Sequence, residues 1–305
     1  METGWYQAAF ERELSDELTA TDLGPVPLVL VRTPDRIRAF DAACPHRGAH
    51  LAHGGKLDGA AIVCPFHGKR IQLGPVGRYR AREHQVLGYG GMVFVGLGEH
   101  CDNGFADLLD KLTVSHLFIP GFSLTVEMAA DWVIENAFDG THFRPVHGIG
   151  NEPSLEVVPA GLGDELTFAV RGVFLLPPSP WRRTGGKPTE VPFLAKAFSP
   201  HVVVTEIGGQ FPYTAITAAT PLPAGGCRIR FSVAVLADGQ ESLPTEQARR
   251  YYRYLLESSR AGIEQDIPIW EHLRPVEPDY DSADHTVIAF REFCAKFRTE
   301  PRCAS

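Results

Sequence analysis

Short apolar runs interrupted by Gly and Pro characterise the first third of the chain. They occupy residues 26–31, 37–40, 60–63, 85–87 and 92–97. Short strands separated by turn residues are typical of a small antiparallel β domain. A polar stretch at 100–104 and a helical turn at 105–112 come next, so we expect a first domain at 1–112.

The pattern changes after this point. A strand at 118–127 and a helix from about Ala129 are followed by longer alternating runs at 155–158, 166–176, 202–207, 213–220 and 228–236. Turn signals separate these runs, which predict an antiparallel meander. Residues 245–266 have the apolar spacing of one long amphipathic helix, which we expect Pro268 to stop. The predicted fold class is α+β, with a second domain at 113–305 in which a curved sheet and the helix enclose a cavity.

Two features of this second domain leave alternatives open. The stretch from Pro177 to Pro192 is too polar and broken for a strand or a helix, and it fits either a lid over the cavity or a surface loop. Five aromatic residues on the strands fit either the cavity lining or ordinary core packing. They are Phe174, Phe198, Phe211, Tyr213 and Phe231.

Length and charge narrow the class of protein. A chain of 305 residues exceeds the usual size of one core, which agrees with two domains. Its formal net charge of −8 argues against nucleic acid as a partner. No stretch has the length of a membrane span, and residues 1–10 lack the basic and apolar regions of a signal peptide. We therefore expect a soluble, cytoplasmic protein.

The most specific motif is a pair of mixed Cys and His segments, Cys44-Pro45-His46 and Cys64-Pro65-Phe66-His67. A Rieske [2Fe–2S] cluster needs two Cys on one iron and two His on the other. Two loops that each supply one thiolate and one imidazole meet this need. Gly48 and Gly68 follow the two His, where the backbone has to turn sharply.

The alternative for this motif is a tetrahedral zinc site, because two Cys and two His also satisfy zinc. Zinc fingers commonly pair Cys with Cys and His with His, whereas each segment here is mixed. The other four of the six Cys have no regular spacing and are expected to be reduced thiols. They are Cys101, Cys227, Cys294 and Cys303.

A second metal site is indicated by the segment from Asn136 to His147. Asn136, Asp139 and His142 recur at intervals of three and would share one broad helical face. Pro145 is expected to end this helix, so that His147 turns back toward His142. Two His and one carboxylate form the facial arrangement of non-haem Fe(II) oxygenases.

The carboxylate has two candidate donors at the end of the long helix, Glu264 and Asp266. We prefer Asp266, because it lies one turn beyond Gly262 on the buried stripe. Asp139 fits a solvated or capping acid, or a carboxylate that accepts a hydrogen bond from a metal-bound His and fixes its orientation.

With these motifs the chain resembles the α subunit of Rieske non-haem iron oxygenases over nearly its full length. The segments 135–148 and 265–271 are most similar to the branch of ketosteroid hydroxylases and cholesterol desaturases. The resemblance implies an N-terminal Rieske β domain followed by a helix-grip, START-like catalytic domain, assembled as a homotrimer.

The resemblance also implies a role for each site residue. Cys44, His46, Cys64 and His67 would hold the cluster, and His142, His147 and Asp266 would hold the catalytic iron. Asp139 would connect His142 to His67 of the partner subunit as the route for electrons.

The expected activity is the oxidation of a C–H bond with O2 and two externally supplied electrons, by hydroxylation, desaturation or oxidative dealkylation. The substrate would be an apolar, steroid-like or other cyclic small molecule. Because the chain has no flavin or nicotinamide fingerprint, the electrons would come from a separate reductase, with or without a ferredoxin. Five cationic residues near the cluster loops fit a docking patch for an acidic donor or solvated surface charge. They are Lys56, Lys69, Arg70, Arg78 and Arg80.

Two other functions stay open from the residues alone. The chain could be a Rieske electron carrier fused to a ligand-binding domain without catalytic iron. It could also be a zinc-stabilised module that binds a lipid-like ligand. Iron in the second site would separate the first of these from an oxygenase, and the red-brown colour of a cluster would exclude the second.

Overall fold

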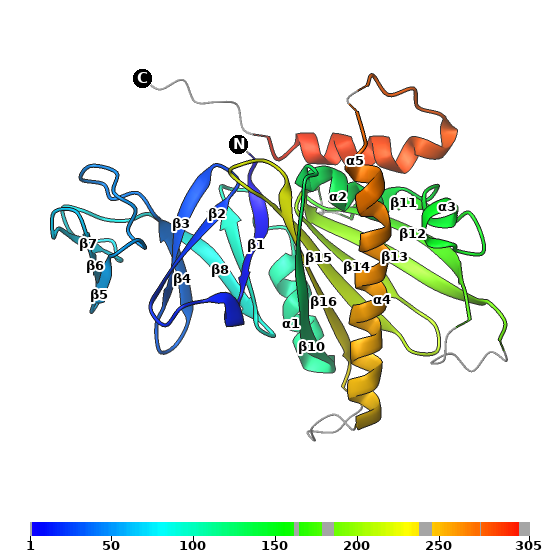
Figure 1. The fold of residues 1–305 in the computed structure, drawn as a ribbon, viewed down its shortest axis with the longest axis horizontal. Coiled ribbons are helices and arrows are strands. Elements are labelled where there is room, and N and C mark those ends of the chain that lie inside the picture. The colour runs from blue at the N-terminus through cyan, green and yellow to red at the C-terminus, as the bar shows by residue number, and fades with distance from the viewer. Residues whose placement is uncertain (1, 162–164, 179–185, 238–245, 275, 299–305) are drawn as a thin grey trace.

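A computed structural model describes residues 2–161, 165–178, 186–237, 246–274 and 276–298. Its strands form two large antiparallel sheets and one small sheet, and the longest helix lies along the second large sheet (Figure 1). The α+β fold class expected from the sequence is confirmed.

The N-terminal part contains a six-stranded sheet and a three-stranded sheet. The six strands run in the order β1, β9, β8, β4, β3, β2, and the other three in the order β5, β6, β7. Their bounds are β1 Gly4–Phe10, β2 Leu18–Leu23, β3 Val26–Arg32, β4 Ile37–Asp41, β5 Lys56–Asp58, β6 Ala61–Val63, β7 Arg70–Gln72, β8 Glu83–Tyr89 and β9 Met92–Leu97. Each apolar run expected in this region is a strand. Strands β1, β2, β5 and β7 were not predicted.

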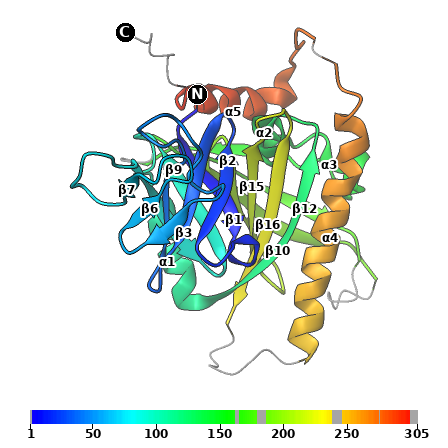
Figure 2. The same ribbon diagram turned by 60° about the vertical axis from the view of Figure 1, so that its left-hand side comes forward.

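The C-terminal part is built on a seven-stranded antiparallel sheet, in the order β10, β16, β15, β14, β13, β12, β11. The bounds are β10 His116–Val126, β11 Glu156–Val158, β12 Phe168–Leu176, β13 Thr189–Ser199, β14 Val202–Ile207, β15 Tyr213–Pro221 and β16 Cys227–Leu236. Helix α4, Glu246–Trp270, crosses one face of this sheet (Figure 2).

The other helices lie around this sheet. They are α1 Phe105–Ser115, α2 Ala130–Glu135, α3 Phe143–His147 and α5 His285–Ala295, and short 3₁₀ turns cover Glu11–Glu13, Asn136–Phe138 and Ser282–Asp284. None of the helices in the described ranges combines the length and apolar character needed to cross a membrane.

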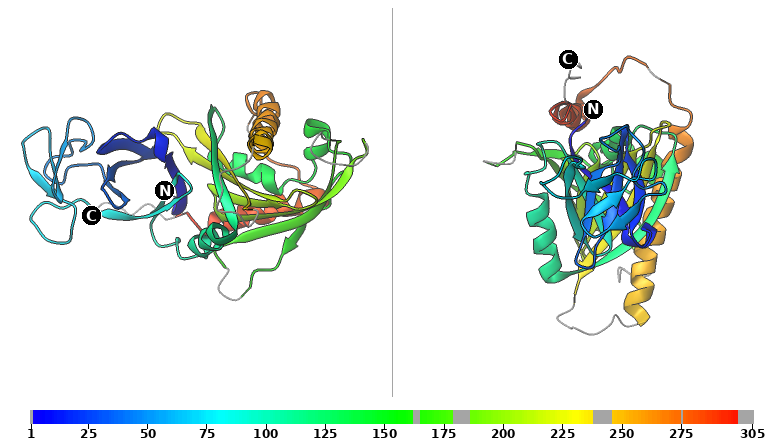
Figure 3. Two further views of the ribbon diagram at one scale, coloured as in Figure 1. Left: turned by 90° about the horizontal axis from the view of Figure 1, so that it is seen from below. Right: turned by 90° about the vertical axis from the view of Figure 1, so that its left-hand side faces the viewer.

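The two parts share a core on the sheet face opposite α4. Trp5 of β1 and Phe94 of β9 pack with Phe105 of α1 against Phe198 and Ile216 of the large sheet. Phe198 is therefore a core residue and does not line the cavity, contrary to one alternative considered from the sequence. The N-terminal part extends from this contact, with β5 to β7 at the far end of the molecule (Figures 1 and 3).

Two predicted boundaries are wrong. The long helix does not stop before Pro268 but continues through it to Trp270. A Pro inside a helix removes one backbone hydrogen bond, and here the helix ends only two residues later. The stretch from Pro177 to Pro192 is not all loop either, because β13 begins at Thr189 and Pro192 faces Val173 of β12. Residues 179–185 of that stretch lie outside the described residues.

Candidate metal centres

The two Cys and His segments form turns of the same design. The Gly48 N–H donates to the Cys44 carbonyl over 2.8 Å, and the Gly68 N–H donates to the Cys64 carbonyl over 3.0 Å. Both glycines have positive φ, 77° and 65°, which side chains disfavour. The Cys44 N–H donates to the Ala49 carbonyl, and the Cys64 N–H makes the equivalent bond to Lys69. The backbone thus presents the two pairs of candidate ligands symmetrically.

The four side chains separate into a thiol pair and an imidazole pair. The Cys44 and Cys64 thiols are buried and contact each other, and the His46 and His67 rings lie 4.9 Å apart at their centroids. No three of these four side chains have ligand atoms within 4.8 Å of one another, a criterion that another group of described residues does meet. The four side chains therefore do not converge on one point. This two-plus-two arrangement fits a binuclear cluster better than a single tetrahedral zinc.

Two details indicate a bound group between the loops. The His46 Nδ1 is buried without a hydrogen-bond partner, although buried polar atoms are nearly always paired. Burial alone raises the pKa of the Cys64 thiol, but the backbone N–H groups of Phe66 and His67 point at its sulfur and lower that pKa overall. The unpaired His46 nitrogen suits an imidazole ligand of a [2Fe–2S] cluster, and the lowered pKa of Cys64 suits a thiolate ligand, whereas burial raises the pKa of the Cys44 thiol.

The segment from Asn136 to His147 does not form the single helix expected. Helix α2 ends at Glu135, a 3₁₀ turn covers Asn136–Phe138, and Asp139 leaves the helical region with φ −93° and ψ 106°. A second helix, α3, begins after His142. Pro145 does not end a helix, because it lies in the first turn of α3, where Pro is tolerated.

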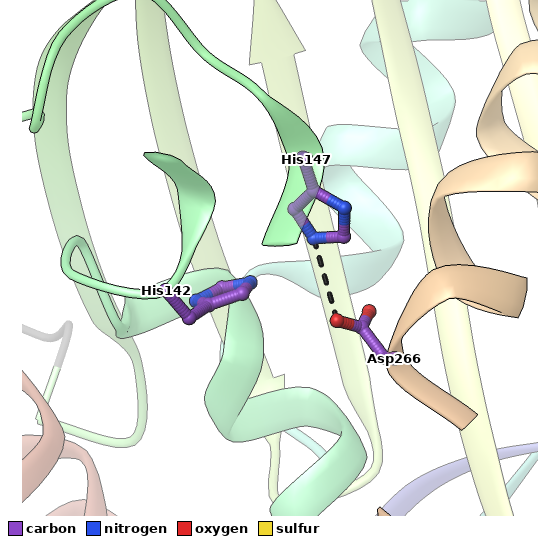
Figure 4. Close-up of side chains that lie close together, drawn as sticks. All are labelled: His142, His147 and Asp266. Atoms are coloured by element: carbon purple, nitrogen blue, oxygen red, sulfur yellow. Dashed lines mark ion pairs between the residues drawn. The ribbon is translucent and has the colours of Figure 1, made fainter. Parts of the chain in front are cut away.

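This broken backbone still brings three candidate ligands together. One ligand atom each from His142, His147 and Asp266 lies within 4.8 Å of the others (Figure 4). The His147 Nε2 is 3.4 Å from the Asp266 carboxylate. Ligands that lie about 2.1 Å from one ion at right angles are about 3 Å apart, so the group fits one ion. Two imidazoles and one carboxylate suit a non-haem Fe(II) centre with open positions.

The structure distinguishes the two carboxylate candidates. Asp266 is 7% exposed, and its oxygens face the imidazoles. Glu264 is exposed and pairs with Arg260 over 2.7 Å, one helical turn away. Only Asp266 is brought to the His pair.

Each of the three groups has an orienting partner. The His142 Nδ1–H donates to the Asp139 carbonyl over 2.9 Å, and the Asp139 carboxylate lies 3.4 Å from the same nitrogen. The His147 Nδ1–H donates to the Gln265 amide oxygen over 3.0 Å, and the Asn136 side chain hydrogen-bonds to Asp266. These contacts leave Nε2 of each ring as the available ligand atom. The role of Gln265 was missed, because an amide next to a ligand carries no spacing signal.

The carboxylates differ in their acidity. Burial opposes ionisation of Asp139, but hydrogen bonds from His142 and Thr141 outweigh it and lower its pKa to about 2. Burial raises the pKa of Asp266, against the attraction of His147 and His142. Asp139 is therefore anionic at neutral pH, as expected of a group that orients an imidazole.

Helix α5 holds the Asn136–Phe138 turn in place. The Thr286 hydroxyl donates to the Phe138 carbonyl over 2.6 Å, and the Phe138 ring stacks on Phe290 at 4.6 Å. Arg291 pairs with Glu135 over 2.5 Å, directly before the turn. The sequence patterns did not predict helix α5.

The three candidate ligands line a cavity of about 530 Å³ between α4 and the large sheet. Phe174, Tyr213 and Phe231 line it too, as one alternative for these aromatics expected. Phe211 borders a smaller hollow next to it instead. A larger surface hollow of about 880 Å³ contains none of the three ligands, so size alone does not identify the site.

Comparison with known proteins gives two family matches. A Rieske [2Fe-2S] domain matches residues 4–86, and a 3-Ketosteroid 9alpha-hydroxylase C-terminal domain matches residues 109–297. The second match covers more than half of the chain.

Individual relatives are more distant. Aminopyrrolnitrin oxygenase of Pseudomonas fluorescens is 24% identical, with 95% of this chain and 89% of the relative aligned. Cholesterol 7-desaturase of Bombyx mori is 42% identical over 66 residues, which are 21% of this chain and 15% of the desaturase. The chain thus spans only a small part of the length of that desaturase.

Solved structures share the fold over most of the chain. The Pseudomonas putida CBB5 protein NdmA with caffeine superposes with a TM-score of 0.70 at 16% identity, covering 96% of this chain and 90% of NdmA. Apo dicamba monooxygenase gives a TM-score of 0.66 at 17% identity, covering 97% and 96%. A [2Fe–2S] cluster and a mononuclear iron are the cofactors of this family, and both sets of side chains fit them. The chain belongs to the Rieske non-haem iron oxygenases, with a catalytic domain of the 3-ketosteroid 9α-hydroxylase type.

Proposed function

We propose that this chain is an oxygenase component that oxidises a C–H bond of an apolar cyclic molecule, steroid-like or other, with O2 and two external electrons. The reaction is hydroxylation, desaturation or oxidative dealkylation. The observation that carries the proposal is the convergence of His142, His147 and Asp266 on one side of a largely apolar cavity. The relatives compared above are named as oxygenases, oxygenase components or a desaturase, and none of these is named as an electron carrier.

In this proposal each metal has a defined ligand set. Cys44, His46, Cys64 and His67 hold the cluster, which supplies electrons one at a time. His142, His147 and Asp266 would hold the iron, which would supply the chemistry of O2 activation. The two sets belong to domains divided at residue 112, as 1–112 and 113–305.

The protein residues contribute orientation and exclusion of water. The Asp139 carbonyl and the Gln265 amide fix the tautomers of the two imidazoles, so that each Nε2 faces the metal position. Asn136 holds Asp266 by a hydrogen bond that also stabilises its buried negative charge. The aromatic walls of the cavity exclude water and position the substrate carbon near the ligand triad.

The proposal includes a homotrimer. In one chain the cluster loops lie at the opposite end of the molecule from α3 and α4 (Figures 1 and 3). His67 of the partner subunit is proposed to approach Asp139, whose carboxylate then connects it to His142. The exposed position of His67 agrees with such a contact.

The electron donor is proposed to be a separate reductase, directly or through a ferredoxin, in the cytoplasm. Relatives are named as oxygenase components or subunits, among them dicamba O-demethylase and vanillate O-demethylase. Lys56, Lys69, Arg70, Arg78 and Arg80 are exposed around the cluster loops. Arg70 already pairs with Asp58, so the other four carry most of the free positive charge for an acidic donor.

The test is the iron and acid-labile sulfide content of anaerobically purified protein. A cluster and a mononuclear site together predict about three iron per two sulfide. A ratio of about one to one that added Fe(II) does not raise contradicts the oxygenase proposal and favours an electron carrier.

A further inference from the structure

The cavity beside the ligand triad has two distinct kinds of wall. The sheet side is mostly hydrophobic and includes Phe174, Phe193, Val203, Ala215 and Phe231. Thr205 of β14 and Thr217 of β15 interrupt this surface with hydroxyl groups. A hydroxyl on an otherwise apolar cavity wall is a point where a bound molecule can form a hydrogen bond.

The register of the sheet places the two threonines close together. Thr205 pairs with Ala215 across the β14 and β15 strands, and Thr217 pairs with Val203. Thr205 and Thr217 are therefore diagonal neighbours on one face, where backbone positions lie about 7–8 Å apart and side chains approach more closely. Both side chains face the cavity that contains His142, His147 and Asp266.

Some other buried threonines of this chain are hydrogen-bonded to carbonyl groups, whereas buried Thr214, which does not line this cavity, makes no such bond among the described residues. Thr220 donates to Gln7 and Thr286 donates to Phe138. Thr205 is only 9% exposed and Thr217 is half-buried, and neither hydroxyl makes a hydrogen bond to another described residue. Neither oxygen is among the fully buried unpartnered atoms, so both are accessible to a molecule in the cavity. Valine has nearly the same shape and would complete the apolar wall, so it removes the hydroxyl alone.

We propose that the Thr205 and Thr217 hydroxyls bind a neutral oxygen of the substrate, a carbonyl or a hydroxyl, and so select which carbon faces the metal. This inference rests on the proposed function. The remaining described lining, apart from the triad, is apolar or bears neutral hydroxyl and amide groups. The preferred substrate is then a rigid apolar ring system with an oxygen at a fixed distance from the oxidised C–H bond.

The test uses the iron-loaded full-length protein and two pairs of probes that differ by one carbonyl oxygen. These are 5α-androstan-3-one with 5α-androstane, and 9-fluorenone with fluorene. Binding is measured by calorimetry, and the oxidised positions are determined by mass spectrometry. Thr205→Val and Thr217→Val remove the hydroxyls at constant shape. Two variants are controls. Thr205→Ser retains the hydroxyl at that position, and Thr214→Val alters a buried threonine of β15 that does not line this cavity.

We expect at least one ketone to bind the unaltered protein more tightly than its hydrocarbon. Each valine variant should weaken ketone binding roughly 3- to 10-fold and spread oxidation over more positions, without affecting the hydrocarbon. Thr205→Ser and Thr214→Val should bind like the unaltered protein. Because the substitutions remove a hydroxyl that makes no hydrogen bond within the protein and keep the shape of the side chain, the valine variants should unfold no more easily.

Three results would overturn the proposal: no ketone binds, ketone and hydrocarbon bind equally, or the valine variants weaken both alike. Failure of the proposed function is recognised separately. In that case bound ketone depends on the threonines but is not oxidised in the presence of O2 and reductant.

Discussion

Two carboxylates in the last turns of α4 show how a shift of two positions decides which side chain is a candidate metal ligand. Glu264 and Asp266 are separated by a single residue, yet Glu264 lies toward solvent with Arg260, and Asp266 is buried against the His pair. Residues two apart on a helix face different directions, so at most one of them can complete the site.

We therefore expect Asp266→Ala to lose the mononuclear iron and retain the cluster. Iron should fall from about three to about two per chain, with sulfide unchanged at about two. Iron and sulfide analysis measures both. Glu264→Gln is the matched control and should retain about three iron. Iron loss in Glu264→Gln but not in Asp266→Ala would assign the ligand to Glu264 instead.

Arg291 and Glu135 form a second decisive pair, just before the Asn136–Phe138 turn. The Glu135 side chain is 14% exposed. Burial raises its pKa from the ordinary value of 4.5, although Arg291 opposes this effect. Arg291→Met leaves a buried carboxylate without its partner and should lower the free energy of unfolding by about 2–3 kcal/mol at neutral pH.

The pH dependence of this loss has a definite sign. A carboxyl whose pKa is higher in the folded protein destabilises the fold as pH rises through the interval between its unfolded and folded pKa. Removing Arg291 raises the folded pKa further, so the loss should shrink as pH falls toward 4.5. Urea unfolding at several pH values measures it. Arg250→Met, in an exposed pair with Glu246, should change stability by about 0.5 kcal/mol or less at each pH. A loss that grows on acidification would contradict the account.

In helix α4 a single glycine, Gly262, affects both the stability of the helix and the shape of the cavity. Gly262 lies inside this helix one turn before Asp266 and lines the cavity. Apart from its chain neighbours and the adjacent helix backbone, no described atom lies within 4 Å of where its Cβ would be. Glycine in a helix costs about 0.5–1 kcal/mol relative to alanine. Here the missing side chain adds room in front of the ligand triad.

Gly262→Ala should therefore raise the free energy of unfolding by about 0.5–1 kcal/mol and weaken binding of bulky ring compounds. Denaturant unfolding and calorimetric titration with 5α-androstan-3-one test the two effects. Gly121→Ala is the contrasting variant, because its Cβ would lie 2.5 Å from the Phe231 carbonyl and should destabilise the protein. Destabilisation by Gly262→Ala would mean that the glycine is needed by the backbone.

Elements that are determined by residues close together in the sequence were predicted, and elements that depend on distant contacts were not. Strands β9 and β14 were found because their apolar runs are bounded by turn residues. The ligand loops were found because their chemistry lies within four residues. Strand β1 is fully buried by pairing with β9, some 90 positions away, and α5 packs on α2 through contacts that no local pattern contains. The break at Asp139 has a local cause, because the Asp139 carboxylate accepts a hydrogen bond from the Thr141 N–H, two residues on. The Asp139-Gly140 pair is a turn signal that the reading of one helix overlooked.

For the whole molecule, the separation of the two metal centres is the decisive feature. The cluster loops lie beyond β4, at the end of the molecule away from α3 and α4 (Figure 1). Between the two candidate metal centres lie the seven-stranded sheet, the shared core around Phe105 and the six-stranded sheet. Since electron transfer weakens steeply with distance, a chain acting alone should reduce its own iron poorly. Assembly of several copies solves this problem if each cluster faces the iron of the next chain.

Mixed assemblies test this arrangement directly. Cys64→Ser removes a cluster ligand and Asp266→Ala removes an iron ligand, so homogeneous preparations of either variant should be inactive. Coexpression with two different affinity tags, followed by purification on both, yields assemblies that contain both chains. We expect them to regain part of the activity, because an intact cluster of one chain serves an intact iron of another. Assemblies of two differently tagged Asp266→Ala chains are the control and should stay inactive. Doubly tagged mixed assemblies without activity would contradict transfer between chains, and failure to obtain any doubly tagged protein would contradict the oligomer itself.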